Sequence, residues 1–223
     1  MKKISIIIAT FFLLNLISLA QPLRDFSIGP FFSLKAGLNG GNVMDGRKNA
    51  VSFNGIPDLG ASLFVPLSES SDLGLEAEMA YTTYSYMIKG VNVDKDYTLK
   101  YHYLTLNPNF YFNWLIIGFN FGLPLSADFG ESISTDILEI MIEFKLGAMF
   151  PLMTDESGSL NLNLQAGYML TGIYKDFPKN DPLLPYIPEV PPQTISSKFN
   201  PRALSLSLGV SYLMNLNSVP LEE

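Results

Sequence analysis

The charged residues best placed to do chemistry stand two positions apart inside apolar segments. Glu76 and Glu78 form one such pair, Glu143 and Lys145 form a second, and Lys35 stands in a third segment. Residues two apart share one face of a β-strand. We therefore predict an interior ion-pair network of Lys35, Glu76, Glu78, Glu143 and Lys145. It could carry a gated ion path or an acid–base site, but paired charges that plug an interior are the preferred interpretation, because an unpaired buried charge is costly.

His102 is the only histidine and falls on the apolar side of its segment, near one end. Some outer-membrane lipid hydrolases carry a histidine and a serine two positions apart on such a surface. Here the sequence is His102-Tyr103-Leu104, with no serine at that spacing. We interpret His102 as an interfacial side chain beside two tyrosines. No catalytic residue is predicted.

The composition excludes several kinds of site. The chain has no cysteine, so it can form no disulfide, thiolate metal site or cysteine nucleophile. One histidine is too few for a histidine metal cluster, and the acidic residues form no calcium loop. No metal or other cofactor is predicted. The net charge is −7, and losing Lys2 and Lys3 makes it −7 − 2 = −9, which argues against nucleic acid as a partner.

The N-terminus reads as a secretory signal peptide over residues 1–20. Lys2 and Lys3 precede the apolar run Ile4–Ile17, and Ser18-Leu19-Ala20 offers small residues for cleavage before Gln21. An uncleaved anchor is the alternative, but a run of about 14 residues is short for the ~30 Å hydrocarbon core. We assign residues 21–216 to a single β-barrel domain and residues 217–223 to a C-terminal tail. No later stretch is apolar enough for a spanning helix, so a second membrane would be crossed as a closed barrel.

The stretch Ala203–Met214 shows the organisation of the rest. Leu204, Leu206 and Leu208 alternate with Ser205 and Ser207, a period of two that no helix produces. The same alternation predicts eight strands: Phe26–Leu38, Ile56–Pro66, Leu73–Ile88, Tyr97–Asn113, Leu115–Ala127, Leu138–Phe150, Ser159–Tyr174 and Ala203–Met214.

The two faces of these strands differ in charge. The apolar faces carry a single charged residue, Lys100, near the end of its strand. A charge on the lipid face near the middle of a bilayer costs about 2–4 kcal/mol, so a membrane would enforce this avoidance. The opposite faces carry seven charges: Lys35, Asp58, Glu76, Glu78, Glu139, Glu143 and Lys145.

The fold class we predict is all-β, an eight-stranded antiparallel up-and-down transmembrane β-barrel. Its longest connections follow the first, fifth and seventh strands, which fits long outer loops, short periplasmic turns and both termini in the periplasm. Eight strands leave an interior that side chains fill, so we expect no wide pore. Aromatic residues near strand ends fit interfacial girdles, with core packing as the alternative: Tyr81, Tyr84, Tyr86, Tyr111, Trp114, Phe129 and Tyr174.

The chain resembles the PorT-like outer-membrane β-barrel domain family of Bacteroidota and related bacteria. The resemblance spans about Phe26–Leu216 and rests on five segments: IGPFFSLKAGLN, LGLEAEMAYTTY, YHYLTLNPNF, SLNLNLQAGYMLTG and LSLSLGVSY. It implies a barrel in the outer membrane of a Gram-negative cell. The secretion role of the member that gives the family its name is not carried over.

We expect a small non-enzymatic outer-membrane barrel with a structural or surface-interaction role. Its partners would be outer-membrane lipid, the barrel-assembly machinery during insertion, and a protein bound through the proline-rich loop 175–200, since loops on rigid scaffolds tend to carry function. One alternative is a soluble periplasmic barrel that binds an apolar ligand, as lipocalins do, with the polarity of the faces reversed. A second is an outer-membrane lipid-modifying enzyme that uses His102.

Overall fold

The computed structural model describes residues 26–41, 47–53, 55–68, 72–90, 96–129, 132–182 and 200–216. The predicted signal peptide, residues 1–20, and the tail 217–223 lie outside these ranges. The elements are β1 (Ser27–Asn39), β2 (Arg47–Ala50), β3 (Ser52–Phe53), β4 (Asp58–Pro66), β5 (Leu73–Gly90), β6 (Asp96–Phe112), β7 (Leu115–Asp128), β8 (Ser132–Ile133), a 3₁₀ turn at Thr135–Ile137, β9 (Met141–Asp155), β10 (Gly158–Met169) and β11 (Ala203–Asn215).

The eight long strands close into one antiparallel ring. They pair in the order β1, β4, β5, β6, β7, β9, β10 and β11, and β11 pairs again with β1 from Ser27↔Asn215 to Asn39↔Ala203. Each strand pairs with its neighbours along the chain, which is the up-and-down topology that the alternation predicts. Closure leaves neither the first nor the last strand with an unpaired edge. Within the described residues, no helix is both long and apolar enough to cross a membrane.

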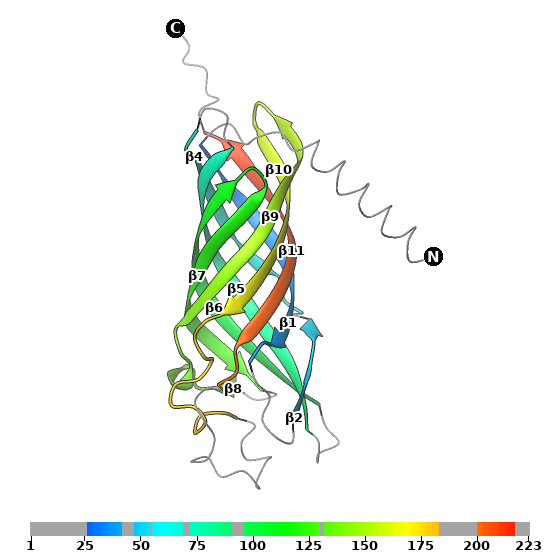
Figure 1. Ribbon diagram of the computed structural model, residues 1–223, viewed down its shortest axis with the longest axis vertical. Coiled ribbons are helices and arrows are strands. Elements are labelled where there is room, and N and C mark those ends of the chain that lie inside the picture. The colour runs from blue at the N-terminus through cyan, green and yellow to red at the C-terminus, as the bar shows by residue number, and fades with distance from the viewer. Residues whose placement is uncertain are drawn as a thin grey trace, which may run out of the picture.

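Connections of different length gather at opposite ends of the barrel. Short turns join β4 to β5, β6 to β7 and β9 to β10, all at the same end of the barrel. The first and last described residues also lie at this end, where Leu216 N donates to Phe26 O at 2.9 Å. We call this the turn end and the opposite one the loop end. The loop end is below the ring in Figure 1. Three of its four connections are longer than these turns, namely those between β1 and β4, β7 and β9, and β10 and β11, whereas the connection between β5 and β6 spans only residues 91–95. In the turn between β6 and β7, Asn113 has a φ of 57°, a left-handed conformation that asparagine tolerates.

Apolar side chains cover the outside of the ring. Leu106 is 53% exposed, Leu123 56% and Leu208 52%, whereas the alternate positions Asn107, Gly122 and Ser207 are buried. Because successive residues of a strand face opposite ways, the apolar faces point outward and the polar faces point inward. The predicted orientation of the strands, with the apolar faces outward and the polar faces inward, is confirmed. The lipocalin-like alternative needs the reverse arrangement and is wrong for this chain.

Three predicted strand boundaries differ from the structure by three or more residues. The predicted sixth strand, Leu138–Phe150, begins instead at Met141 and runs on to Asp155, so the expected turn Pro151–Gly158 shrinks to Glu156-Ser157. Pro151 fits in this strand because β7 pairs with β9 only as far as Leu115↔Ala148, so the missing N–H of Pro151 costs no bond on that side.

The other end of the same hairpin also differs from the prediction. β10 ends at Met169 rather than at Tyr174, and the chain then bends inward so that Ile173 and Tyr174 are buried at the mouth of the barrel. The predicted loop Asn39–Gly55 contains the short strands β2 and β3, and the loop Asp128–Ile137 contains β8.

Most of the aromatic residues expected in interfacial girdles lie inside the barrel. Tyr84, Tyr86, Tyr111 and Tyr174 are at most 2% exposed, because their positions belong to the inward-facing half of each strand or to the mouth. They follow the alternative of core packing. Trp114 remains exposed at the turn end, where its ring stacks on Phe150 with centroids 6.1 Å apart.

Candidate functional site

Buried apolar side chains pack together at each end of the barrel interior. At the turn end five buried side chains pack together, and we call them the turn-end cluster: Phe64, Tyr111, Ile116, Met149 and Leu213. At the loop end a larger set, the loop-end cluster, includes Tyr86, Leu99, Tyr101, Tyr174 and Phe177. The charged side chains lie between these two clusters.

The loop-end cluster is built partly from the start of the β10–β11 connection. Ile173, Tyr174 and Phe177 are buried against side chains of β5 and β6, and the hydroxyl groups of Tyr101 and Tyr174 contact each other. A bridge between Leu138 and Tyr174 ties this segment to the chain just before β9. The first part of the predicted partner-binding loop therefore packs into the mouth of the barrel. Residues 183–199 of that loop lie outside the described residues.

The predicted interior charges face the centre of the barrel and are largely buried, although they do not form one continuous network. Lys145 Nζ lies 3.3 Å from Glu78 Oε2. Glu78 also accepts from Asn107, and from Gln165 Nε2 at 3.5 Å. The structure thus pairs two of the five predicted residues directly, from strands β5 and β9.

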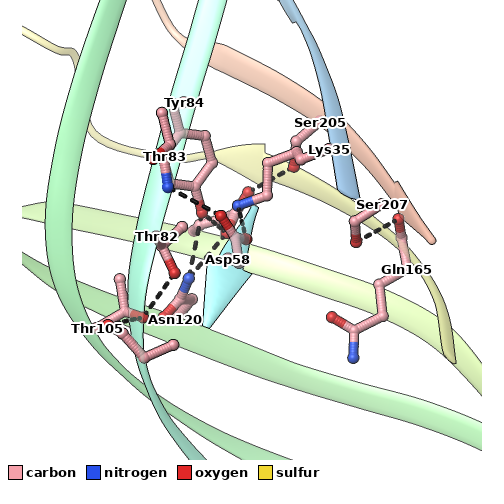
Figure 2. A network of polar contacts seen from close by, with 12 residues as sticks. Lys35, Asp58, Thr82, Thr83, Tyr84, Thr105, Asn120, Gln165, Ser205 and Ser207 are labelled. Carbon is pink, nitrogen blue, oxygen red and sulfur yellow. Dashed lines mark hydrogen bonds and ion pairs between the residues drawn. The ribbon is translucent and has the colours of Figure 1, made fainter. Parts of the chain in front are cut away.

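Lys35 pairs with a residue outside the predicted set. Its Nζ lies 2.6 Å from Asp58 Oδ2 and 3.9 Å from the centre of the Tyr84 ring, a cation–π contact (Figure 2). Asp58 Oδ1 accepts from the backbone N–H of Thr83 at 2.9 Å. Asp58 was already identifiable as an inward charge, but nothing in the sequence indicates its partner.

Glu143 is held by neutral donors. The Tyr84 hydroxyl donates to Glu143 Oε2, Asn120 Nδ2 donates to the same oxygen at 3.1 Å, and Ser205 Oγ donates to Oε1 at 3.0 Å. A Cβ at Gly167 would lie 2.0 Å from Glu143 Oε1, so glycine leaves the space that this carboxylate fills. Glu76, 2% exposed, accepts from Asn109 Nδ2 at 3.2 Å.

His102 lies on the outward side of β6, as predicted, and is 8% exposed. Its Nδ1 is within hydrogen-bonding distance of Tyr81 Oη (2.6 Å) and Thr83 Oγ1 (3.1 Å), and its ring stacks on Tyr81. These contacts use Nδ1 to fix the imidazole against the barrel wall. In the described residues no group of three or more His, Asp or Glu side chains gathers as a metal site.

We predict that His102→Gln has little effect. Glutamine keeps a polar group facing Tyr81 and Thr83, so the expected loss of stability is about 1 kcal/mol, the value of a typical hydrogen bond. Urea unfolding of the two folded proteins in the same lipid measures the difference. Loss of a lipid-hydrolysing activity in this variant, with folding intact, would instead support the enzymatic alternative.

Comparison with known proteins gives structural likeness only. No family model and no curated protein matches the chain. Among solved structures, the attachment invasion locus protein Ail of Yersinia pestis, crystallised with the heparin analogue sucrose octasulfate, shares 14% identity over 85% of this chain and 99% of its own, with a TM-score of 0.37.

Two other solved structures are similarly distant. The outer membrane protein OprG of Pseudomonas aeruginosa is 14% identical over 87% of this chain and 95% of its own, with a TM-score of 0.36. The translocator domain of the autotransporter NalP of Neisseria meningitidis is 10% identical over 95% and 97%, with a TM-score of 0.34. Likeness at this level carries no argument about function. The resemblance to the PorT-like family stays a prediction.

Proposed function

We propose that this chain is a non-enzymatic, non-conducting β-barrel of the outer membrane that acts structurally or through its long loops. The observation that carries the proposal is the outward apolar surface combined with an interior closed at both ends. Leu106, Leu123 and Leu208 are all more than half exposed, which suits contact with acyl chains rather than water. Among the described residues, the turn-end and loop-end clusters fill the two ends of the interior with buried apolar side chains, which argues against a wide path for a solute.

The first test combines membrane insertion with conductance. A folded barrel in detergent should migrate differently on a gel before and after boiling, and it should insert into phospholipid vesicles. In planar bilayers we expect no stepwise ion conductance. A protein that stays soluble without detergent, or one that opens large steady channels, would contradict the proposal.

The proposed orientation places the loop end outside the cell and the chain termini in the periplasm. The chain has no cysteine, so single cysteines can report on each end. Ser132 lies exposed at the loop end and Glu156 lies exposed in the β9–β10 turn. A membrane-impermeant thiol reagent should label Ser132→Cys in intact cells, and Glu156→Cys only after the outer membrane is permeabilised. The reverse pattern would invert the orientation.

Loop 175–200 is the segment we propose for contact with a protein partner. Lys175 and Asp176 are exposed beside the buried Phe177, so this loop is anchored at the mouth while presenting charged side chains outward. The other proposed partners are outer-membrane lipid, which would surround the outward apolar surface, and the assembly machinery during insertion.

We predict that Leu208→Arg destabilises the barrel in lipid by about 2–4 kcal/mol. Leu208 lies mid-strand on β11, between exposed Leu34 on β1 and Leu164 on β10, where an arginine would face hydrocarbon. Urea unfolding in phospholipid vesicles, followed by the heat-shift gel, measures the loss.

The matched control is Met214→Arg, on the same face of β11 but at the turn end. Near the interface an arginine costs only about 0–1 kcal/mol, so this variant should resemble the parent protein. Equal effects of the two substitutions would argue against a bilayer around the outward apolar surface of the barrel.

A further inference from the structure

A small cavity lies in the middle of the barrel, among the charged side chains. Its lining includes Lys35, Asp58, Glu78, Asn120, Glu143 and Lys145, several of which Figure 2 shows converging from different strands. The free space is about 20 Å³, enough for roughly one particle the size of a water molecule.

Two buried amide oxygens of residues lining this cavity have no hydrogen-bond donor among the described residues. The NH₂ groups of Asn107 and Asn120 donate to the carboxylates of Glu78 and Glu143. Rotating either amide by half a turn would place its oxygen against a carboxylate oxygen, so the orientation is fixed. Asn107 Oδ1 and Asn120 Oδ1 therefore remain without a hydrogen-bond partner among the described residues, although both side chains are 2% exposed. Each needs a donor or a cation.

The charges around the cavity favour a cation. The lining carries two ammonium groups and three carboxylates, so its formal charge is 2 − 3 = −1. Lys35 is engaged by Asp58 and Lys145 by Glu78. Among the described residues the hydrogen-bond donors to Glu143 are all neutral, and Lys145, which also acts on Glu143 electrostatically, forms its ion pair with Glu78. A cation beside Asn120 would both compensate the negative charge of Glu143 and satisfy the amide oxygen of Asn120.

We propose that this cavity binds one monovalent alkali cation, Na⁺ or K⁺. Its ligands are the amide oxygens of Asn107 and Asn120, with the carboxylates of Glu78 and Glu143 beside them. Carbonyl and carboxylate oxygens are the groups that hard cations prefer. A single charge matches the lining, while a divalent ion would leave excess positive charge beside the two lysines.

Thermal unfolding of the full-length folded barrel in detergent tests the proposal. Samples are refolded in NaCl, KCl or N-methyl-D-glucamine chloride at equal ionic strength, and the folded fraction is followed by the heat-shift gel. A cation that binds only the folded state should raise the midpoint by roughly 5–10 °C at about 100 times its Kd. Equal midpoints in all three salts would overturn the proposal.

Two variants separate a bound cation from a general salt effect. Asn120→Leu should remove the difference between the salts. Asn163→Leu is the matched control, because Asn163 is another buried interior asparagine, donating to Ser211 Oγ at 3.0 Å, and does not line the cavity. It should keep the difference between salts even if it lowers every midpoint.

Crystals of the unaltered protein grown in RbCl give a reading that depends on no variant. An anomalous peak within ligand distance of Asn107 Oδ1 and Asn120 Oδ1 would support the site. Density for water alone at this position would contradict it.

Discussion

Replacing Lys145 with methionine should lower the free energy of unfolding by about 3–5 kcal/mol. The ammonium group lies 3.3 Å from Glu78 Oε2, and the Glu78 side chain is 4% exposed. Methionine has a similar length but no charge, so it would leave a buried carboxylate with only the amide donors of Asn107 and Gln165. The chain has one tryptophan, Trp114, whose fluorescence can follow urea unfolding in lipid vesicles together with the heat-shift gel.

The control removes both charges. In Lys145→Met combined with Glu78→Gln, the glutamine keeps acceptor and donor groups near Asn107, and the carboxylate that Lys145 pairs with is removed together with the ammonium group. Because exchange of a whole buried ion pair for neutral groups is often neutral or stabilising, the double variant should recover most of the lost stability. If the single variant unfolds at the same urea concentration as the parent protein, the ion pair makes no net contribution.

Alternation along each strand was sufficient to predict the face of a residue. Leu208 outward and Glu143 inward both follow from a period of two, and the closed eight-stranded ring follows from eight such segments without a spanning helix. The two-residue period does not indicate which strands face each other across the barrel interior. Glu78 and Lys145 are 67 residues apart in the chain, and their contact depends on how far each strand is shifted along its neighbour.

The same limit explains why the sequence does not predict the contacts of Lys35. Lys35 reaches Asp58 and the Tyr84 ring because β4 begins at Asp58 while β1 and β5 continue past that level toward the loop end. No local pattern encodes that difference in strand length. Tyr84 was expected at an interface because it lies near a strand end, yet its position belongs to the inward set. Alternation is thus a better guide than distance from a strand end, and it would have placed Tyr84 correctly.

The inward bend after Met169 was not predictable for a related reason. Leu170 continues the apolar alternation of β10, but its N–H and that of Thr171 both donate to Ile142 O, and Ile173 and Tyr174 fill the mouth. An apolar residue that fills the mouth of a barrel and one that extends a strand have the same sequence pattern. Only the space left by the neighbouring strands distinguishes them.

The turn-end cluster gives the second large effect, because Phe64 has no exposed surface and supports the closure of that end. Its ring packs edge-on against Tyr111, with centroids 5.4 Å apart. Phe64→Ala should cost about 3–5 kcal/mol, from lost burial and the cavity that remains. Urea unfolding in vesicles measures it, and conductance should stay absent because the loop-end cluster still closes the other end.

Gly74 offers a direct check on the cause of that loss. A Cβ on Gly74 would lie 2.4 Å from the Phe64 ring, so the aromatic ring occupies the space that a side chain at position 74 would need. Gly74→Leu alone should therefore destabilise the barrel by overpacking, typically by about 1–3 kcal/mol. In the Phe64→Ala background the same leucine enters the vacated space and should restore part of the lost stability. Strict additivity of the two losses would show that the ring and the glycine are not complementary, and that the turn end is held by the remaining members of the cluster.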